Sequence, residues 1–534
     1  MVTRRVLLAI CLLSMSDPAK ILAVGRIPHK ATNHSLRQSV EQKKEGVQAL
    51  AQFNIVHVRE ALAYLASDSL EGRETSEPGQ KEAAAFIAKK FKDLGLKPLG
   101  DSGTFLQHFF VNVNYISDSS FVETDGSYYW GNKDIVVMPF GAGDTAITAP
   151  VVFAGYGFES DNYSDYDGID VKGKIVILLD GNPPFADSSS IMIKTGLYKR
   201  GNAVKHGAAA VLLAVKGGKT GFAKIYQHFE SLFGNKPMRL NTGIKSSQTP
   251  TKLQTIYIDE DLANQFLRRQ GTDLEIVSRK LDSLQKPESM MLGSASVYIK
   301  LESETRLTEN VIGMIEGTSL KNEYVVYSAH YDHLGKSPEG DVYHGADDNA
   351  SGTCTVLGIA EMYAKSNLRP KRSVIFLTVT GEEKGLLGSD YFTAHPTVPI
   401  ANIVADLNTD MDGRIDTSYL RKDSNYVFVI GSKRLSKELD SLLVSADSES
   451  VRIKLDYSFD SDNDPNQFYY RSDQYNFARR NIPVVFFFDG NIPEYHKPTD
   501  TIDKIDFPIL EERAKLIFLT GWKAANLDWR LLLN

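Results

Sequence analysis

The segment Val325-Val326-Tyr327-Ser328-Ala329-His330-Tyr331-Asp332 is an apolar run that ends in a histidine and an aspartate. Such a run is typical of a strand that is buried on both faces. Ser373–Val379 and Ile403–Leu407 have the same character, and the helical pattern of Ala350–Ala364 lies between the first two runs. Strands that alternate with helices predict an α/β fold with a mixed, mostly parallel twisted sheet flanked by helices.

The same pattern of buried strands and amphipathic helices extends toward both ends of the chain. Pro483–Phe488 is predicted to be another buried strand, and Pro508–Trp529 a closing amphipathic helix. Near the N-terminus, helical periodicity starts at about Val56, and a second helix follows Pro78. Between these two helices, Leu70–Glu74 is predicted to form a polar turn.

From about Asp125 to Thr305, short apolar runs alternate with turns rich in Gly, Asp and Tyr, which predicts a β-rich insert. One helix is expected around Asn202–His206, and Lys216–Thr251 is expected to be mostly loop. The expected strands of this region are Ile135–Met138, Val151–Ala154, Lys174–Leu179 and Ala208–Val215.

The composition is that of an ordinary globular protein. The chain has 534 residues, of which 42% are hydrophobic and 24% charged, and its net charge is −7. Because nucleic-acid-binding domains usually carry a basic excess, no nucleic-acid partner is expected. The body of the protein has a single cysteine, Cys354, which we expect to be a small buried hydrophobic residue.

Residues 1–16 resemble a secretory signal, with two arginines, the apolar run Val6–Leu13 and a small-residue cleavage site. The run is too short to span a bilayer, which takes about 18 apolar residues. A lipid anchor on Cys11 is not expected, because Ile10 occupies the place of the small residue that a lipobox needs. We therefore expect an exported protein, periplasmic or secreted, without a stable membrane anchor; residues 17–50 are predicted to be a loosely ordered arm.

Polar side chains follow the predicted strands where each strand ends. His330, Glu382, Glu383 and Asp410 all lie at or just past such an end. Ligands bind at this edge of an open α/β sheet. The sequence therefore predicts a cluster of metal ligands or acid–base groups there.

Each motif also has a simpler interpretation. His330 and Asp332 fit a metal ligand whose second ring nitrogen is held by the carboxylate, but also an ordinary turn histidine. In Gly345-Ala346-Asp347-Asp348-Asn349-Ala350-Ser351-Gly352, the two carboxylates could bridge cations or cap the following helix. Glu382 and Glu383 could divide the roles of general base and ligand, or form a solvated acidic turn.

A last motif, Glu494–Asp500, follows the strand that ends at Phe488. His496 could bind a second cation, Tyr495 could donate to a developing oxyanion, and Asp500 could orient His496 or the loop. Two imidazoles and three carboxylates are a donor set that suits zinc. Two zinc ions would leave a net charge of about +1 and an electrophilic site.

A resemblance to a known family rests on the joint order and spacing of these motifs. It is carried by Ser328–His333, the Gly345–Gly352 segment, Gly381-Glu382-Glu383, Asn408-Thr409-Asp410-Met411 and Tyr495-His496. Together they resemble the co-catalytic di-zinc aminopeptidase family, metallopeptidase family twenty-eight. The turn Leu70–Arg73 is similar to the N-terminal part of the same catalytic domain.

The resemblance implies a zinc-exopeptidase fold that holds two zinc ions. Asp348 would bridge both ions, His330 and Asp410 would complete the shell of one, and Glu383 and His496 that of the other.

It also implies roles for three further residues. Glu382 would be the general base, and Tyr495 would help to stabilise the tetrahedral intermediate. Asp332 would support His330 from behind the ligand.

The insert is similar to a protease-associated (PA) domain, which would shape substrate access without ligands of its own. The similarity lies in Ala154–Gly157, Gly168–Val176 and Asn202–Ala210. His206 is therefore interpreted as structural. The resulting organisation is a signal peptide (1–16), an arm (17–50), a split catalytic domain (51–124 and 306–534) and the inserted domain (125–305).

The chain departs from the family pattern at two positions. Gln474 stands where relatives commonly have histidine, which should affect the pocket wall rather than the metals. Asp412 stands where an apolar residue is more usual, and we interpret it as a solvated carboxylate, with added negative potential near a substrate amine as the alternative. The acidic run Asp460–Asp464 lacks the glycine of a calcium loop, so no calcium site is expected there.

The predicted function is an exported zinc-dependent aminopeptidase that acts on peptides. A carboxypeptidase of the same fold stays an alternative, and a glutaminyl cyclase or a receptor-like binding protein is a more distant one. The cyclases use one zinc ion and the receptor type has lost its ligands, whereas both ligand sets are present here. The sequence makes no prediction about the oligomeric state.

Overall fold

The computed structural model describes most of the chain beyond residue 41. The described residues are 42–131, 133–138, 144–186, 196–233, 237–241, 253–337, 340–419 and 425–534. The predicted signal peptide and most of the predicted arm lie outside these ranges, so both stay predictions.

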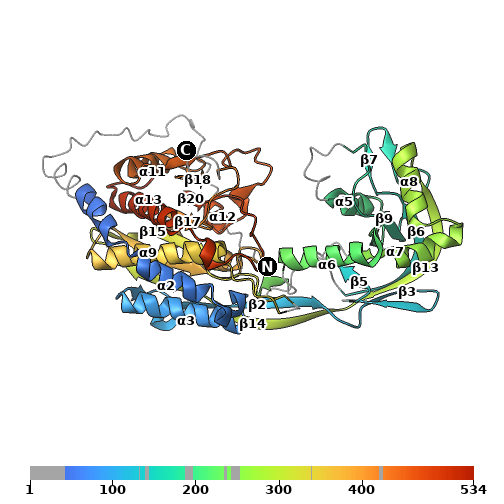
Figure 1. The fold of residues 1–534 in the computed structure, drawn as a ribbon, viewed down its shortest axis with the longest axis horizontal. Coiled ribbons are helices and arrows are strands. Elements are labelled where there is room, and N and C mark those ends of the chain that lie inside the picture. Colours follow the sequence, from blue (N-terminus) through green and yellow to red (C-terminus); the bar gives the residue numbers. More distant parts are fainter. Residues whose placement is uncertain are drawn as a thin grey trace, which may run out of the picture. The chain divides into compact units, whose positions relative to one another are not determined.

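A ten-stranded mixed sheet forms the core of the first part of the fold (Figure 1). Its order is β11-β2-β14-β16-β15-β17-β20-β18-β19, with β1 paired to β14. The central strands β16, β15, β17 and β20 are parallel, whereas β11, β2 and β14 continue the sheet in antiparallel fashion. The bounds are β1 Lys97–Pro98, β2 Leu106–Ile116, β11 Met238–Leu240, β14 Leu301–Ile315, β15 Leu320–His330, β16 Arg372–Val379, β17 Ile403–Thr409, β18 Tyr426–Ile430, β19 Lys454–Asp456 and β20 Val484–Phe488.

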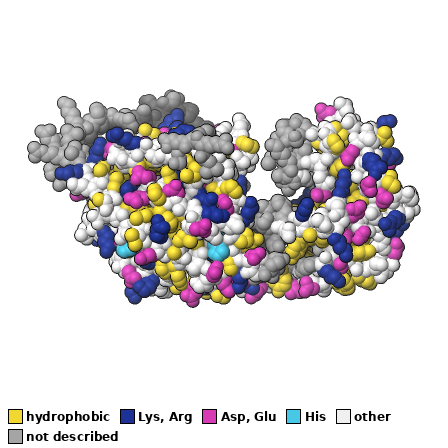
Figure 2. All heavy atoms as spheres, in the orientation of Figure 1, with side chains coloured by type: hydrophobic (Ala, Val, Ile, Leu, Met, Phe, Trp, Pro, Cys, Tyr) yellow, Lys and Arg dark blue, Asp and Glu magenta, His cyan; other side chains and the backbone are white. Residues whose placement is uncertain are grey.

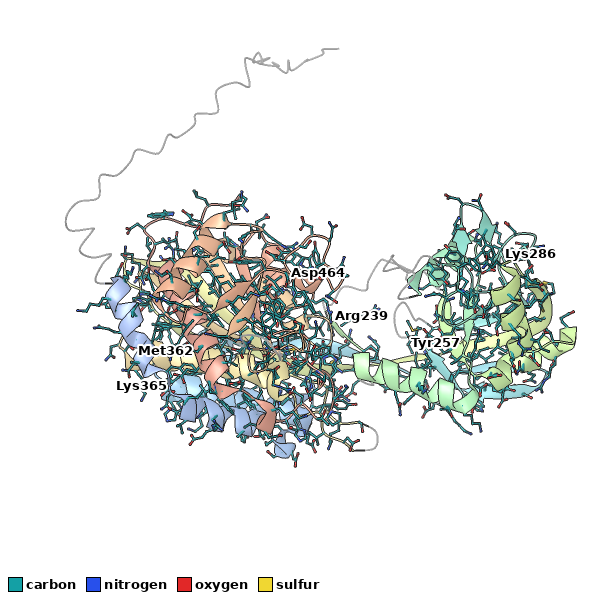
Figure 3. All side chains as sticks on the ribbon, turned by 45° about the horizontal axis from the view of Figure 1, so that its top comes forward. Arg239, Tyr257, Lys286, Met362, Lys365 and Asp464 are labelled. Carbon is teal, nitrogen blue, oxygen red and sulfur yellow. The ribbon has the colours of Figure 1, made fainter. Side chains whose placement is uncertain are left out.

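Helices cover both faces of this sheet, because its central strands are apolar on both sides. One face packs against α2, α3, α9, α11 and α13, and the other against α10 and α12. Asn54 caps α2 and Asp506 caps α13, and α3 begins at Pro78, where a helix was predicted. The bounds are α2 Ile55–Leu65, α3 Pro78–Asp93, α9 Gly352–Lys365, α10 Leu387–Ala394, α11 Lys437–Glu449, α12 Gln474–Ala478 and α13 Phe507–Asn526. Met362 and Lys365 mark α9 in Figure 3.

The insert has its own eight-stranded sheet, in the order β4-β3-β13-β6-β9-β10-β12-β5. The strands β6, β9, β10 and β12 are parallel, and Tyr257 marks β12 in Figure 3. The bounds are β3 Phe121–Thr124, β4 Ser127–Trp130, β5 Ile135–Val137, β6 Thr145–Ala154, β9 Ile175–Leu179, β10 Ala210–Ala214, β12 Gln254–Ile258, β13 Ser289–Ile299, α5 Leu197–Lys205, α6 Gly218–Phe233, α7 Glu260–Leu267 and α8 Leu274–Leu284, with β7 Glu159–Ser160 and β8 Tyr163–Ser164 in a separate hairpin. The domain boundaries drawn at 125 and 305 stay a prediction.

The prediction of a loop at 216–251 is wrong for two segments of that stretch. Gly218–Phe233 forms α6, because Phe222, Ile225 and Tyr226 recur at helical spacing among the lysines and glycines. Met238–Leu240 forms β11, because it pairs with β2. A tertiary contact of this kind leaves no local signal in the sequence.

Residues 42–49, predicted to belong to a loosely ordered arm, are helical. Ala49 is buried in the main core, and the backbone of Gly46 lies against the Trp522 ring so closely that a Cβ would clash with it. Packing against a distant helix therefore orders the end of the arm.

The surface mixes charges of both signs. Figure 2 shows Lys and Arg side chains interspersed with Asp and Glu over the visible face. Among the described residues, the helices are too short or too polar for any of them to cross a membrane.

Candidate metal centre

Strand register brings the predicted polar residues to one edge of the main sheet. His330 is the last residue of β15 and pairs with Val379 at the end of β16. Ser328 pairs with Asn408 on β17, so that Asp410 lies level with His330. Gly381, at φ +78°, turns the chain after β16 and presents Glu382 and Glu383 at the same edge.

A first group of possible ligands consists of His330, Asp348 and Asp410. His330 Nε2 lies 3.2 Å from Asp410 Oδ1 and 3.3 Å from Asp348 Oδ1. The second oxygen of Asp410 accepts a 2.6 Å hydrogen bond from the Ser472 hydroxyl. All of these side chains are buried, so the three ligating atoms converge in a space shielded from bulk water.

A second group shares Asp348 and consists of His333, Asp348 and Glu383. His333 Nδ1 lies 2.7 Å from Glu383 Oε1. His496 joins them: its Nε2 lies 3.1 Å from Glu383 Oε2 and 3.2 Å from Asp348 Oδ2. Asp348 therefore directs one oxygen toward each group, as a bridging carboxylate does.

The donor atoms fit zinc. Both groups offer only imidazole nitrogens and carboxylate oxygens, which zinc prefers. The Nε2 atom of His496 is buried and makes no hydrogen bond, although it faces two carboxylates. Buried polar atoms without partners are rare in native proteins, and such a nitrogen between carboxylate oxygens is poised to bind a cation.

The protonation equilibria show how tightly these groups interact. Burial disfavours the charged form of Glu383, but the imidazole of His496 outweighs it and lowers the pKa of Glu383 to about 2. Burial likewise opposes ionisation of Asp348, yet its interactions with His330 and His496 hold its pKa well below the usual range. Both carboxylates are therefore ionised and able to bind metal.

Glu382 differs from its neighbour. Burial, followed by the carboxylates of Asp410 and Glu383, raises the pKa of Glu382 well above its usual value. Its side chain lines a cavity of about 70 Å³ together with Asp348 and Asp410. The remaining lining is mixed and consists of the apolar residues Met411, Phe468, Phe486 and Phe488, together with Arg471, Ser472, Gly490, Asn491 and Tyr495.

Tyr495 lies beside the second group. Its ring stacks on His496 at a centroid distance of 3.9 Å. Although 40% of the Tyr495 surface is exposed, partial loss of hydration at its hydroxyl, followed by the charges of Asp348 and Glu383, raises its pKa above the usual value. The phenol therefore keeps its proton and can donate a hydrogen bond.

Asp332 and Asp500 lie behind the ligands, but their contacts differ from those predicted. His330 Nδ1 lies 3.1 Å from the main-chain oxygen of Asp332 and 3.8 Å from its carboxylate. The Asp332 carboxylate instead accepts a bond from the Thr75 hydroxyl. Asp500 accepts the main-chain N–H groups of Asp347 and Asp348, so it orients that turn rather than His496.

The interpretation of Asp412 as a solvated carboxylate is wrong. Asp412 is fully buried and accepts a 2.6 Å bond from the Thr355 hydroxyl, and burial raises its pKa to about 6. Gln474 is also buried, and its Oε1 accepts a bond from Asn408 Nδ2. It therefore supports the sheet edge and does not line the cavity described above.

Three other expectations concern residues away from the site. Cys354 is buried, as expected of a small hydrophobic residue. His206 stacks on Tyr166 and pairs with Glu159, which is a structural role. In the acidic run, Asp460 pairs with Arg434.

Sequence reasoning did not assign a role to two residues of the site. His333 was visible only as the last residue of the His-Tyr-Asp-His run, and Ser472 as part of the Ser-Asp-Gln segment. Neither type is diagnostic alone, because a histidine or serine has many structural uses. Only the fold shows that both face metal-ligating side chains.

Two family matches cover different parts of the chain. Residues 310–520 match Peptidase family M28, and residues 147–259 match the PA domain. The first match contains every predicted catalytic and metal-ligating residue, and the second lies within the predicted insert.

Curated relatives share parts of this sequence. Aminopeptidase NAALADL1 of Rattus norvegicus is 39% identical over 102 residues, which are 18% of this chain and 12% of the relative. Aminopeptidase YwaD of Bacillus subtilis (strain 168) is 24% identical over 392 residues, which are 72% of this chain and 68% of the relative. The chain thus spans only about an eighth of the length of NAALADL1.

Solved structures show the same fold. An aminopeptidase from Aneurinibacillus sp. strain AM-1 has a TM-score of 0.57 at 20% identity, and the match covers 92% of this chain and 98% of that one. BSAP, a zinc aminopeptidase from Bacillus subtilis, has a TM-score of 0.54 at 19% identity over 90% of this chain and 98% of its own.

Proposed function

We propose that this chain, which carries an M28 peptidase domain and an inserted PA domain, is an exported zinc-dependent aminopeptidase that binds two zinc ions. The observation that carries the proposal is the pair of ligand groups joined by Asp348, with Glu382 beside them in the same cavity. Relatives described as aminopeptidases support the choice of reaction.

Two zinc ions would be held by the residues of the two groups. His330 and Asp410 would bind one ion, Glu383 and His496 the other, and Asp348 both. Bound there, zinc would lower the pKa of a coordinated water and polarise the scissile carbonyl. His333 contacts Glu383 and would hold that carboxylate in place.

The protein's own groups would move the proton and stabilise charge. Glu382, with its raised pKa, would accept the proton of the attacking water and return it to the leaving amine. Tyr495 keeps its proton and would donate a hydrogen bond to the developing oxyanion. The cavity beside Glu382 is small and lined by Met411, Phe468 and Phe486, so it would favour an apolar side chain on the terminal residue.

The direct test is mass spectrometry of a free-ended, mixed-sequence peptide incubated with the zinc-loaded protein, with and without chelator. Chelator-sensitive loss of residues from the N-terminus is expected. Intact peptide in the presence of two bound zinc ions would refute the proposal, and metal analysis of the same sample establishes the occupancy.

One observation favours a carboxypeptidase as the second candidate. Arg471 lines the cavity, and a guanidinium there is a possible partner for a free carboxylate. The same peptide experiment decides between the two, because a carboxypeptidase shortens the peptide from its C-terminal end. An amidated C-terminus would then block cleavage, whereas an acetylated N-terminus would not.

A further inference from the structure

A fully buried arginine lies outside the region that matches the peptidase family. Arg73 ends the turn Asp68–Arg73 between α2 and α3, and none of its surface is exposed. The peptidase match begins only at residue 310. The sequence predicted a polar turn here, yet its arginine points into the fold and not to solvent.

Each hydrogen bond that the Arg73 side chain makes in the described part of the chain goes to a main-chain carbonyl. Its Nε donates to Tyr331 O at 2.8 Å, directly after His330. Its two terminal nitrogens donate to His344 O at 2.7 Å and Gly345 O at 2.9 Å, just before the turn that carries Asp348. One of them also donates to Leu65 O at the end of α2.

The backbone of this turn is built to hold the guanidinium in place. Gly72 adopts φ +69°, and a Cβ there would lie 2.2 Å from Gly335 O, so only glycine fits. Gly335 N donates to Gly72 O at 3.0 Å, and His333 N donates to Arg73 O at 3.2 Å. The main chain of the turn therefore contacts the segment that carries His333. The side chain of Arg73 contacts the segment that carries His330.

The charge of Arg73 is retained despite burial. Burial lowers its pKa to about 10, opposed mainly by the nearby carboxylates of Asp332 and Asp500. The group is therefore still cationic at neutral pH. Burying a cation without a hydrogen-bonded carboxylate costs free energy of folding. We infer that the guanidinium N–H groups of Arg73 serve a role other than stability.

We propose that Arg73 is a positioning residue of the metal centre: by bonding Tyr331 O and the His344–Gly345 carbonyls at once, it sets the separation of His330 from Asp348. The N-terminal turn is then part of the zinc site, although it supplies no ligand. This inference rests on the proposed zinc site and not on the identity of the peptide substrate.

Arg372 provides a matched control. It is also fully buried, and it bonds main-chain oxygens of Leu527 and Trp529 besides the Glu323 carboxylate. It lies at the first residue of β16, whereas His330 is the last residue of β15 and lies at the opposite end of these parallel strands. Lysine at either position keeps the charge, but all its donors lie on one nitrogen, so it cannot reproduce the contacts that the three separate guanidinium nitrogens make with carbonyls of different segments.

The experiment compares Arg73→Lys with Arg372→Lys in the full chain. Zinc affinity is measured by competition with a chromogenic chelator, and the melting temperature of each metal-free protein is measured in parallel. We expect Arg73→Lys to bind zinc about 10- to 100-fold more weakly, the range seen when groups that orient metal ligands are changed, and Arg372→Lys to bind it as the unchanged protein does.

Each result has a definite meaning. Unchanged zinc affinity in Arg73→Lys, or an equal loss in Arg372→Lys, would overturn the inference. If Arg73→Lys folds only with metal, the zinc concentration that half-maximally raises its melting temperature supplies the comparison instead. Failure of the unchanged protein to bind zinc would instead refute the proposed function.

Discussion

The two sheets of this protein both contain a parallel core, yet within the described residues only the larger sheet gathers a candidate metal site. In the inserted domain, polar residues near the ends of the parallel strands are used by the fold itself. Asp165 accepts the N–H groups of Tyr156 and Phe158, and Asp259 caps α7. In the domain of the main sheet, imidazoles and carboxylates instead converge on one another in the two ligand groups that share Asp348. This convergence of several possible ligands, rather than polar residues as such, distinguishes the site.

The largest expected effect distinguishes two carboxylates, one from each domain. Glu382→Gln should lower kcat about 10³-fold, because a positioned general base contributes about 10²- to 10⁴-fold, while zinc content stays the same. Asp165→Asn should leave kcat unchanged and lower the free energy of unfolding by about 1–3 kcal/mol. Steady-state kinetics and denaturant unfolding measure both. Normal turnover in zinc-replete Glu382→Gln would remove Glu382 from its proposed role.

A second expected effect concerns a buried charge in the inserted domain. Burial lowers the pKa of Lys199 to about 7, whereas a lysine in the unfolded chain titrates near about 10.4. Between these values the unfolded chain binds more protons, so the free energy of unfolding should rise with pH, by up to about 1.4 kcal/mol per pH unit.

Urea unfolding at pH 7, 8 and 9 measures this slope. Lys199→Met should flatten it, while Lys216→Met, at a more exposed lysine bonded to the Tyr156 hydroxyl, should not. Equal slopes in Lys199→Met and the unchanged protein would show that Lys199 is not the group responsible.

A smaller effect is expected behind the metal ligands. Asp332→Asn should weaken zinc binding about tenfold, because its carboxylate orients Thr75 and the Glu382 main chain beside His330. Asp259→Asn in the inserted domain should change neither zinc affinity nor stability, since asparagine caps a helix as well as aspartate does. Chelator competition measures the zinc affinity. Equal zinc affinities in Asp332→Asn and Asp259→Asn would show that the Asp332 carboxylate does not support the metal ligands.

The smallest effect is expected at a histidine that resembles a ligand in the sequence. His206 pairs with Glu159 near the surface of the inserted domain, and such pairs contribute about 0–1 kcal/mol. His206→Gln should therefore lower stability by less than about 1 kcal/mol and leave zinc content and kcat unchanged. A loss of bound zinc in this variant would show a metal site in the inserted domain.

Much of the main sheet could be predicted from the sequence, because its central strands are continuous apolar runs with a polar residue at each end. β15, β16, β17 and β20 all lie within a few residues of their predicted bounds. The errors occur where long-range contacts decide the outcome. β11 is a strand because it pairs with β2, and residues 42–49 are helical where Gly46 packs against Trp522.

The residues of the candidate site also fall into two groups: those that local motifs reveal and those that only long-range contacts reveal. The side chains His330, Asp348, Glu383, Asp410 and His496 could be named from motifs, because imidazoles and carboxylates at strand ends are unusual together. His333, Ser472 and Arg73 could not, because their contacts are with groups far away in the chain. The burial of Asp412 was missed for the same reason, since a carboxylate at a strand end is normally exposed.

The amino-acid sequence by itself determined which residue types stand at the ends of the buried strands, because the position of a strand along the chain depends on local patterns of hydrophobicity. Only the tertiary structure decided how those residues are held. Arg73 joins two segments about 260 to 270 residues away from it in the chain, and Asp500 binds a turn more than 150 residues before it. Such contacts depend on where the finished fold places main-chain donors and acceptors, which no local pattern encodes.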